Sequence, residues 1–156
     1  LQDWALNRES LLSFLPFARQ RMEILSDFAP LGSYLVSGML PIRLEDLKSS
    51  GMDEDQLLEV LQYALWRLEA VQNWNRDHIF KALESVADGM NIKLKPFLVP
   101  LFIAITGSTA SISVMDSMNL LGADMSRARL RHAIELTGGI GKKKLKKMEK
   151  AYQALS

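Results

Sequence analysis

The chain reads PLFIAITGS at residues 100–108, an apolar run that stops at a Thr-Gly pair. Its phenylalanine and isoleucine residues suit a buried strand as well as a buried helix. A strand needs a neighbour, however, and no other stretch alternates apolar and polar residues for long enough to supply one. The sequence therefore predicts a buried helix over residues 96–106, closed by Gly107 in the left-handed conformation that glycine adopts without strain.

Apolar residues recur at helical spacing on both sides of this run. Asp53 and Asn75 favour helix N-termini, so we expect a helix after each of them. The other expected helices cover residues 7–28 with a kink at Pro16, one turn at 44–48, a short piece from Ser111 or Ser113 to Gly122, 125–136 after an Asp124 cap, and 142–155. The expected fold is all-α, a multi-helix bundle in two packed subdomains.

Composition changes near residues 41–52, where a loop-like stretch interrupts the apolar pattern. We therefore expect one helical subdomain at residues 1–45, a second at 46–139, and a basic C-terminal helix at 140–156. The glycines at residues 138–141 predict a flexible break before that last helix. Because residue 1 is Leu, we also expect the chain to be a piece of a longer protein.

The net charge of +1 hides an asymmetry. Residues 127–156 carry nine Lys or Arg and two Asp or Glu, whereas residues 1–126 carry ten and sixteen. A basic end on an acidic body suggests an anionic partner, although a solvated helix face is the simpler alternative. The candidate phosphate-binding residues are Arg19, Arg127, Arg129, Arg131, Lys142, Lys143 and Lys144.

Several kinds of site find no support in the sequence. There is no cysteine, so disulfides and thiolate metal sites are excluded, in agreement with a cytoplasmic location. His78 and His132 lie far apart without ligand-spaced companions, and no glycine-rich phosphate loop is followed by Lys-Ser/Thr. The longest apolar run, residues 97–105, is far shorter than a membrane span. We expect no catalytic residue, metal or cofactor in this chain.

After the apolar helix come three short segments, Thr106-Gly107-Ser108, then Leu120-Leu121-Gly122, then Ala128-Arg129-Leu130. In their order and spacing they resemble the C-terminal end of bacterial-type glutamyl-tRNA synthetases. A fourth, residues 18–28, resembles the family's "qeR-x-x-tL-x-eF" segment, and the likeness extends over residues 8–136. The resemblance implies an all-helical region that recognises the anticodon of a tRNA.

The resemblance also implies roles for individual residues. Arg21 matches an arginine that, in the family, contacts the third anticodon base and helps to separate glutamate tRNAs from glutamine tRNAs. Ser111 and Val114 fall in a loop that enters an anticodon pocket, although the usual Pro-Gly pair between them is absent here. Phe102 stands where the family usually has an arginine; stacking on a base and packing in the core are both open interpretations.

The function that follows from the resemblance is recognition of tRNA-Glu for glutamyl-tRNA synthesis, with recognition of tRNA-Gln left open. The parent enzyme would use ATP and Mg²⁺ in a catalytic domain of the same polypeptide, outside this chain. We expect a monomer that does not bind membranes. The alternative is a helical protein–protein interaction domain with a basic docking tail.

Overall fold

The computed structural model describes residues 12–13, 15–16, 33–35, 37–108 and 112–155. Within these ranges the chain forms helices and no strand, which confirms the all-α class. The elements are η2 (Ser33–Leu35), α4 (Leu44–Lys48), α5 (Glu54–Glu69), α6 (Arg76–Gly89), α7 (Leu94–Thr106), α8 (Val114–Leu121), α9 (Ala123–Leu136) and α10 (Lys142–Gln153). Most of the helix expected at residues 7–28 lies outside the described residues.

Side-chain caps begin α5 and α6, as predicted. The Asp53 carboxylate accepts a hydrogen bond from the backbone N–H of Gln56 at 2.8 Å, and the Asn75 side chain accepts one from His78 at 2.9 Å. Each cap satisfies a backbone donor that the first helical turn leaves without a partner. Two short polar side chains thus determine where two core helices begin.

The ambiguous run at residues 96–106 is a helix. α7 begins two residues earlier, at Leu94, and ends at Gly107, whose φ of 74° is the left-handed cap that was predicted. The Gly107 N–H donates to the Ile103 carbonyl at 2.8 Å. α7 packs against η2, α4, α5, α6, α8 and α9, so its apolar residues are buried by helices and need no strand partner.

The junction of α8 and α9 differs in part from the prediction. Ser113 does cap α8, since its hydroxyl accepts from the Asp116 N–H at 3.2 Å. Asp124, however, does not cap α9; it lies in the first turn of a helix that already begins at Ala123. Gly122 ends α8 and also precedes α9, with a φ of 87°, so one glycine makes the whole turn.

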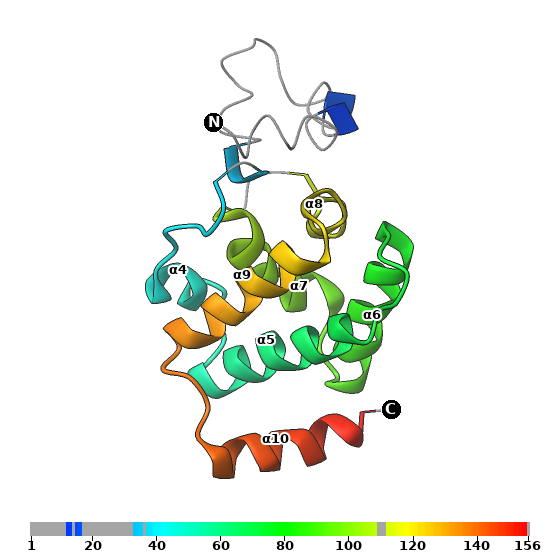
Figure 1. Cartoon of the computed structure of the whole chain (residues 1–156). Helices are drawn as coiled ribbons and strands as arrows, with labels where there is room; N and C mark the ends of the chain where they lie inside the picture. Colours follow the sequence, from blue (N-terminus) through cyan, green and yellow to red (C-terminus); the bar gives the residue numbers. More distant parts are fainter. Residues whose placement is uncertain (1–11, 14, 17–32, 36, 109–111, 156) are drawn as a thin grey trace.

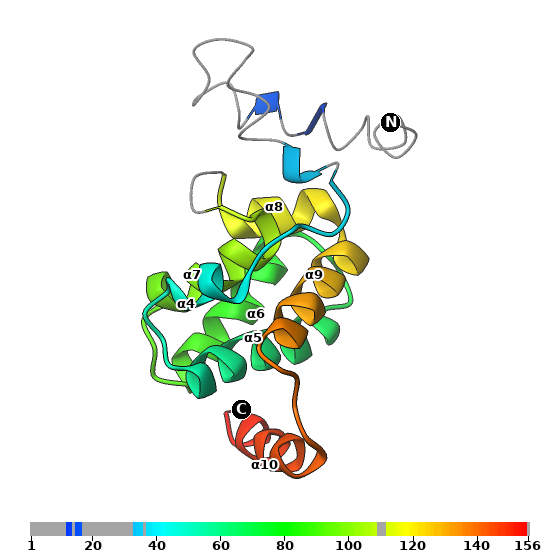
Figure 2. The same ribbon diagram turned by 90° about the vertical axis from the view of Figure 1, so that its left-hand side faces the viewer.

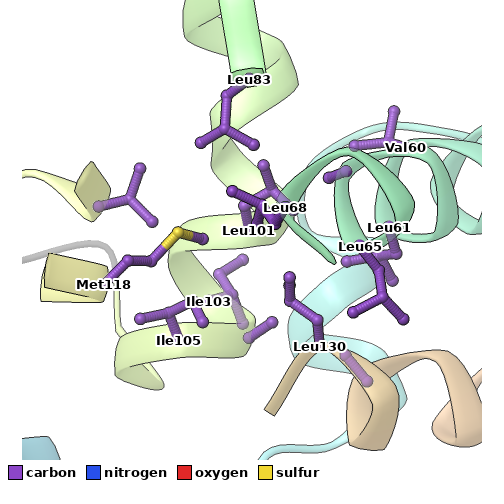
Figure 3. Packing of buried hydrophobic residues seen from close by; sticks show 14 of the residues in the cluster. Val60, Leu61, Leu65, Leu68, Leu83, Leu101, Ile103, Ile105, Met118 and Leu130 are labelled. Carbon is purple, nitrogen blue, oxygen red and sulfur yellow. The ribbon is translucent and has the colours of Figure 1, made fainter. Parts of the chain in front are cut away.

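One apolar core joins most of these helices. Figure 3 shows side chains of α5, α6, α7, α8 and α9 meeting in it, among them Leu65, Leu101 and Leu130. Residues of the segment before α5 belong to the same core, including the buried side chains of Tyr34, Leu40, Ile42 and Leu47. The division of the chain near residue 45 stays a prediction.

Helix α10 stands apart from the other helices. It runs below α5 on one side of the packed helices α4–α9, while α8 lies on the opposite side of them, and two views at right angles agree on this (Figures 1 and 2). The chain reaches α10 through Gly138 and Gly139, whose φ angles of 98° and 73° few other residues adopt. Among the described residues, no helix is both long and apolar enough to cross a membrane.

Candidate nucleic-acid interface

A pocket of about 500 Å³ lies where α7 meets the start of α8. It brings together two of the residues predicted to contact the anticodon, Phe102 and Val114. Phe102 is half-buried, and Val114 is buried at the first position of α8. We call this feature the α7–α8 pocket; its other lining residues are Leu94, Lys95, Leu98, Val99, Ser113 and Met115.

The pocket exists because α7 is apolar on two sides. Phe97, Leu101 and Ile105 recur at a spacing of four and are buried completely in the core. Leu98 and Phe102, also four residues apart, lie on a neighbouring side of the helix and are only half-buried. The helix thus supplies both the core and an apolar wall that no other described segment covers completely.

Polar groups at the start of α8 are fixed by hydrogen bonds. The Ser113 hydroxyl donates to the Asp116 carboxylate at 2.6 Å, and the Arg76 guanidinium pairs with the same carboxylate at 3.1 Å. Lys95 is the lining residue that carries a positive charge, and it is exposed. An aromatic ring in an apolar recess, with a cation beside it, suits an unstacked nucleobase and its phosphate.

Three of the predicted site residues, Arg19, Arg21 and Ser111, lie outside the described residues. Their part in a site stays a prediction. The described residue nearest in sequence to Ser111 is Ile112, which is buried with 1% of its surface exposed.

Arg129 corrects the sequence analysis, which placed it among phosphate-binding residues. Its side chain is 1% exposed, and its guanidinium donates to the backbone carbonyls of Tyr34, Gly38 and Ile105, the Gly38 bond being 2.9 Å long. Burial lowers the pKa of Arg129 to about 10, which leaves it charged at neutral pH. A side chain so enclosed cannot reach an RNA phosphate; it joins α9 to the end of α7 and to the segment around η2.

A hydrogen-bonded chain continues from this arginine to the pocket. The Tyr34 hydroxyl, which is buried, lies 2.9 Å from the Ser117 hydroxyl of α8. The Ser117 hydroxyl donates to the Ser113 carbonyl at 2.9 Å, at the point where α8 begins. The position of the pocket wall on α8 thus depends on contacts made by residues far away in sequence.

The other two arginines of α9 are more accessible. Arg127 is half-buried; it donates to the Leu68 carbonyl at 2.9 Å, and its guanidinium lies 5.5 Å from the centre of the Trp74 ring. Arg131 is exposed and pairs with Glu69 at 3.0 Å. Arg131 can exchange its surface partner for a phosphate at little cost, whereas Arg127 would have to give up a backbone carbonyl.

The predicted phosphate-binding lysines begin α10. Lys142 and Lys143 are exposed, and Lys144 forms an ion pair with Asp55 of α5 at 2.6 Å. The hydrogen bond from Lys144, together with its charge, lowers the pKa of Asp55 below the ordinary value of 3.8. This pair is one of the contacts that join α10 to α5.

Aromatic side chains make the other contacts between α10 and α5. The Tyr152 ring lies 5.7 Å from that of Tyr63 and 5.3 Å from that of Trp66, centre to centre. The Arg67 guanidinium lies 5.4 Å from the Tyr152 ring and donates to its hydroxyl at 3.0 Å. Met148 is buried between the two helices.

Two of these features were missed from the sequence. The inner position of Arg129 could have been suspected, because Ser126 and Ala133, three residues before and four after it, are small side chains that let one side of a helix pack closely. The aromatic contacts of Tyr152 could not, since α5 and α10 are far apart in sequence. Among the described residues, no group of three or more His, Cys, Asp or Glu side chains is arranged to hold a metal.

Residues 1–134 match the family model described as "Anticodon binding domain". Over all 156 residues the chain is 54% identical to a "Glutamate--tRNA ligase" of Saccharophagus degradans and 52% identical to one of Cellvibrio japonicus. Both alignments cover 100% of the chain and 31% of the relative, so the chain spans about a third of the length of these curated relatives. These alignments include α10, which lies beyond the resemblance over residues 8–136.

Proposed function

Since the chain belongs to the anticodon-binding domain family, we propose that it is the part of a glutamate–tRNA ligase that selects tRNA-Glu by its anticodon. The observation that carries the proposal is an apolar pocket with an aromatic wall, within a chain that is similar over its whole length to two glutamate–tRNA ligases. Recognition of RNA sequence depends on unpaired bases that stack on aromatic rings and expose their edges to hydrogen-bonding groups. The α7–α8 pocket, with the ring of Phe102 in its wall, has the composition for stacking.

In this mechanism an anticodon base enters the α7–α8 pocket and stacks on Phe102, with Val114 as the opposite apolar wall. Ser111 hydrogen-bonds a base edge, and Arg21 discriminates the third anticodon base through its planar pair of donors. The roles of Ser111 and Arg21 rest on the family resemblance. The role of Phe102 rests on its half-buried place in the pocket.

Phosphate contacts belong to the exposed cations in this proposal. Arg131, Lys142, Lys143 and Lys144 contribute affinity without reading sequence, as does Arg19. Arg127 contributes less, because its guanidinium already binds the Leu68 carbonyl. Arg129 has no part in binding.

In this proposal the chain is part of a longer enzyme. A catalytic domain on the same polypeptide would activate glutamate with ATP and Mg²⁺ and transfer it to the bound tRNA. Such an enzyme would act in the cytoplasm, where tRNA is charged, and as a monomer. Whether it also charges tRNA-Gln depends on the discrimination that we assign to Arg21.

Binding assays with tRNA transcripts test the proposal. We expect the chain to bind tRNA-Glu and to lose affinity when single anticodon bases are substituted. Arg21→Gln should bring the affinities for tRNA-Glu and tRNA-Gln closer together without changing the melting temperature. Equal affinity of the wild-type chain for all anticodon variants would refute the proposal.

A salt titration separates this function from that of a protein–protein interaction domain. RNA affinity should fall by roughly 0.7 decades per decade of salt for each phosphate contact. A hydrophobic protein interface would respond little to salt.

A further inference from the structure

We infer that α10 forms a second RNA-binding surface, which contacts tRNA phosphates outside the anticodon stem-loop. This inference rests on the proposed function, because it assumes that the ligand is a tRNA. The sequence indicated a basic end and named Lys142, Lys143 and Lys144 as phosphate-binding candidates. The structure adds which lysines face outward, and where they lie relative to the α7–α8 pocket.

Contacts along its whole length fix the orientation of α10. Near its start Lys144 pairs with Asp55, and further along Met148 is buried and Tyr152 enters the aromatic group on α5. Just beyond its end, Leu155 lies so close to Gly89 of α6 that a Cβ there would be 3.0 Å from the Cβ of Leu155. Four contacts on one side of a single helix leave it little freedom to rotate about its axis.

This orientation turns three lysines away from the domain. Lys142, Lys146 and Lys150 are spaced four residues apart, so they form a line of about 12 Å along the helix. All three are exposed, and none forms an ion pair with any residue that the structure describes. We call them the outer lysines.

The other lysines of α10 are placed differently. Lys143 and Lys147 line the groove between α10 and α5 together with two carboxylates, those of Asp55 and Glu59. Those carboxylates neutralise much of the positive charge there. The outer lysines are thus the part of α10 best placed to meet a polyanion.

Electrostatics favours a function for this line. Like charges four residues apart destabilise a helix. The phosphates of an RNA backbone would attract these lysines and offset the repulsion between them. Residues 1–126 carry sixteen acidic and ten basic residues, so the excess positive charge of the chain lies in its C-terminal end. A tRNA approaching the domain is therefore attracted mainly by its C-terminal end.

Location separates this surface from base recognition. α10 and α8 lie on opposite sides of the packed helices in both views (Figures 1 and 2). A tRNA with its anticodon bases in the α7–α8 pocket would meet the outer lysines with another part of its backbone. Phosphate contacts there would raise affinity equally for every anticodon.

The docked state of α10 argues against a membrane as its partner. A basic amphipathic helix binds a bilayer through its apolar side. Here that side is occupied, because Met148 is buried and Tyr152 packs on aromatic rings of α5. Only the charged side is free for a ligand, and nucleic acid phosphates match its chemistry.

Two RNAs test the inference: the complete tRNA-Glu transcript and its isolated anticodon stem-loop. The variant Lys142→Ala/Lys146→Ala/Lys150→Ala should bind the complete tRNA at least tenfold more weakly at 0.1 M salt. Its salt dependence should be shallower by roughly two units, since each lost phosphate contact removes about 0.7. Affinity for the stem-loop should stay within twofold of wild type.

Two further variants sharpen the test. Lys48→Ala/Lys81→Ala/Lys93→Ala removes the same charge from exposed positions outside α10, although Lys48 is paired with Glu54, and should leave both affinities near wild type. Tyr152→Ala keeps every lysine but loosens α10, and it should also weaken binding of the complete tRNA. Unchanged binding by Tyr152→Ala would mean that bulk charge acts rather than a positioned surface, and it would overturn the inference.

The outcomes distinguish this inference from the proposed function. If the outer-lysine variant bound both RNAs equally more weakly, or bound both as well as wild type, the inference would be overturned. Dependence of the wild-type affinity on the anticodon would still support the proposed function. If the affinity of the wild-type chain for tRNA did not depend on the anticodon, the proposed function itself would be overturned.

Discussion

The two ends of this domain present contrasting surfaces. The α7–α8 pocket is apolar, and its walls are continuous with the core: Phe102 lies one position from Leu101, which is completely buried. Helix α10 is highly charged and is joined to α5 and α6 by side-chain contacts. Discrimination of a base needs walls of fixed shape, which a close-packed core provides. Attraction of phosphates needs only charge at the right place, which a docked helix can supply.

The largest effect should be on stability and should come from substitution of Arg129, the buried residue that joins α9 to the end of α7. Arg129→Met leaves the carbonyls of Tyr34, Gly38 and Ile105 without their donors, at about 1–3 kcal/mol each. We expect the free energy of unfolding to fall by about 3 kcal/mol or more, measured by urea denaturation. Arg131→Met, on the exposed side of the same helix, should cost less than about 1 kcal/mol. Equal losses for both variants would contradict the buried role of Arg129.

The next largest effect should be on RNA binding, at the pocket wall. Phe102→Ala removes a stacking surface worth about 1–3 kcal/mol, so affinity for tRNA-Glu should fall roughly 5- to 150-fold. Phe102→Trp keeps an aromatic ring and should bind nearly as well as wild type, whereas Phe102→Leu should behave like the alanine variant. Gel-shift titration checks this order. If leucine binds as well as phenylalanine, the residue is only part of the core.

A smaller effect is expected at the α10 end, where Tyr152→Ala removes the aromatic contacts. Aromatic pairs contribute about 0.5–1.5 kcal/mol beyond the area they bury. We expect faster amide hydrogen exchange in α10 and unchanged exchange in α5, because Met148 is the single buried residue that α10 adds to a core formed mainly by the other helices. Gln153→Ala, at the neighbouring exposed position, serves as the control. Faster exchange throughout the domain would show that α10 is an integral part of the core.

The smallest effect concerns the ion pair between Lys144 and Asp55. Both side chains are exposed, so Lys144→Ala should barely change the melting temperature. In the folded wild type the pKa of Asp55 is lowered, so the pair contributes above the ordinary carboxyl pKa of 3.8, and that contribution is lost as pH falls through the lowered value. An NMR titration should show the pKa of Asp55 rising toward 3.8 in Lys144→Ala. An unchanged pKa would mean that the pair does not persist in solution.

Much of the fold could be predicted because its signals are local. Asp53, Asn75 and Ser113 begin helices through hydrogen bonds to residues three positions later, and such contacts are visible in the sequence. Gly107 ends α7 for an equally local reason. Asp124 shows the limit: it too is a favourable cap, but a glycine with positive φ two residues earlier had already started the helix.

The candidate site was predicted only in part. Phe102 and Val114 line the same pocket, and their contact with an anticodon stays a prediction; the apolar wall formed by Leu98 and its neighbours was not predicted. Apart from Phe102, whose place was left open, the apolar residues of α7 were expected in the core, because periodicity does not show which side of an entirely apolar helix remains uncovered. Arg129 was assigned to the surface because it is a charged residue in a sequence segment rich in other charged residues.

The sequence by itself determined which segments are helical, where most of them begin and end, and that the C-terminal end is basic. Only the tertiary structure decided which charges reach solvent. It buried Arg129 among three carbonyls from distant segments, paired Lys144 with Asp55, and turned Lys142, Lys146 and Lys150 outward. The physical reason is range: caps and turns depend on residues a few positions apart, whereas burial depends on every helix that packs nearby.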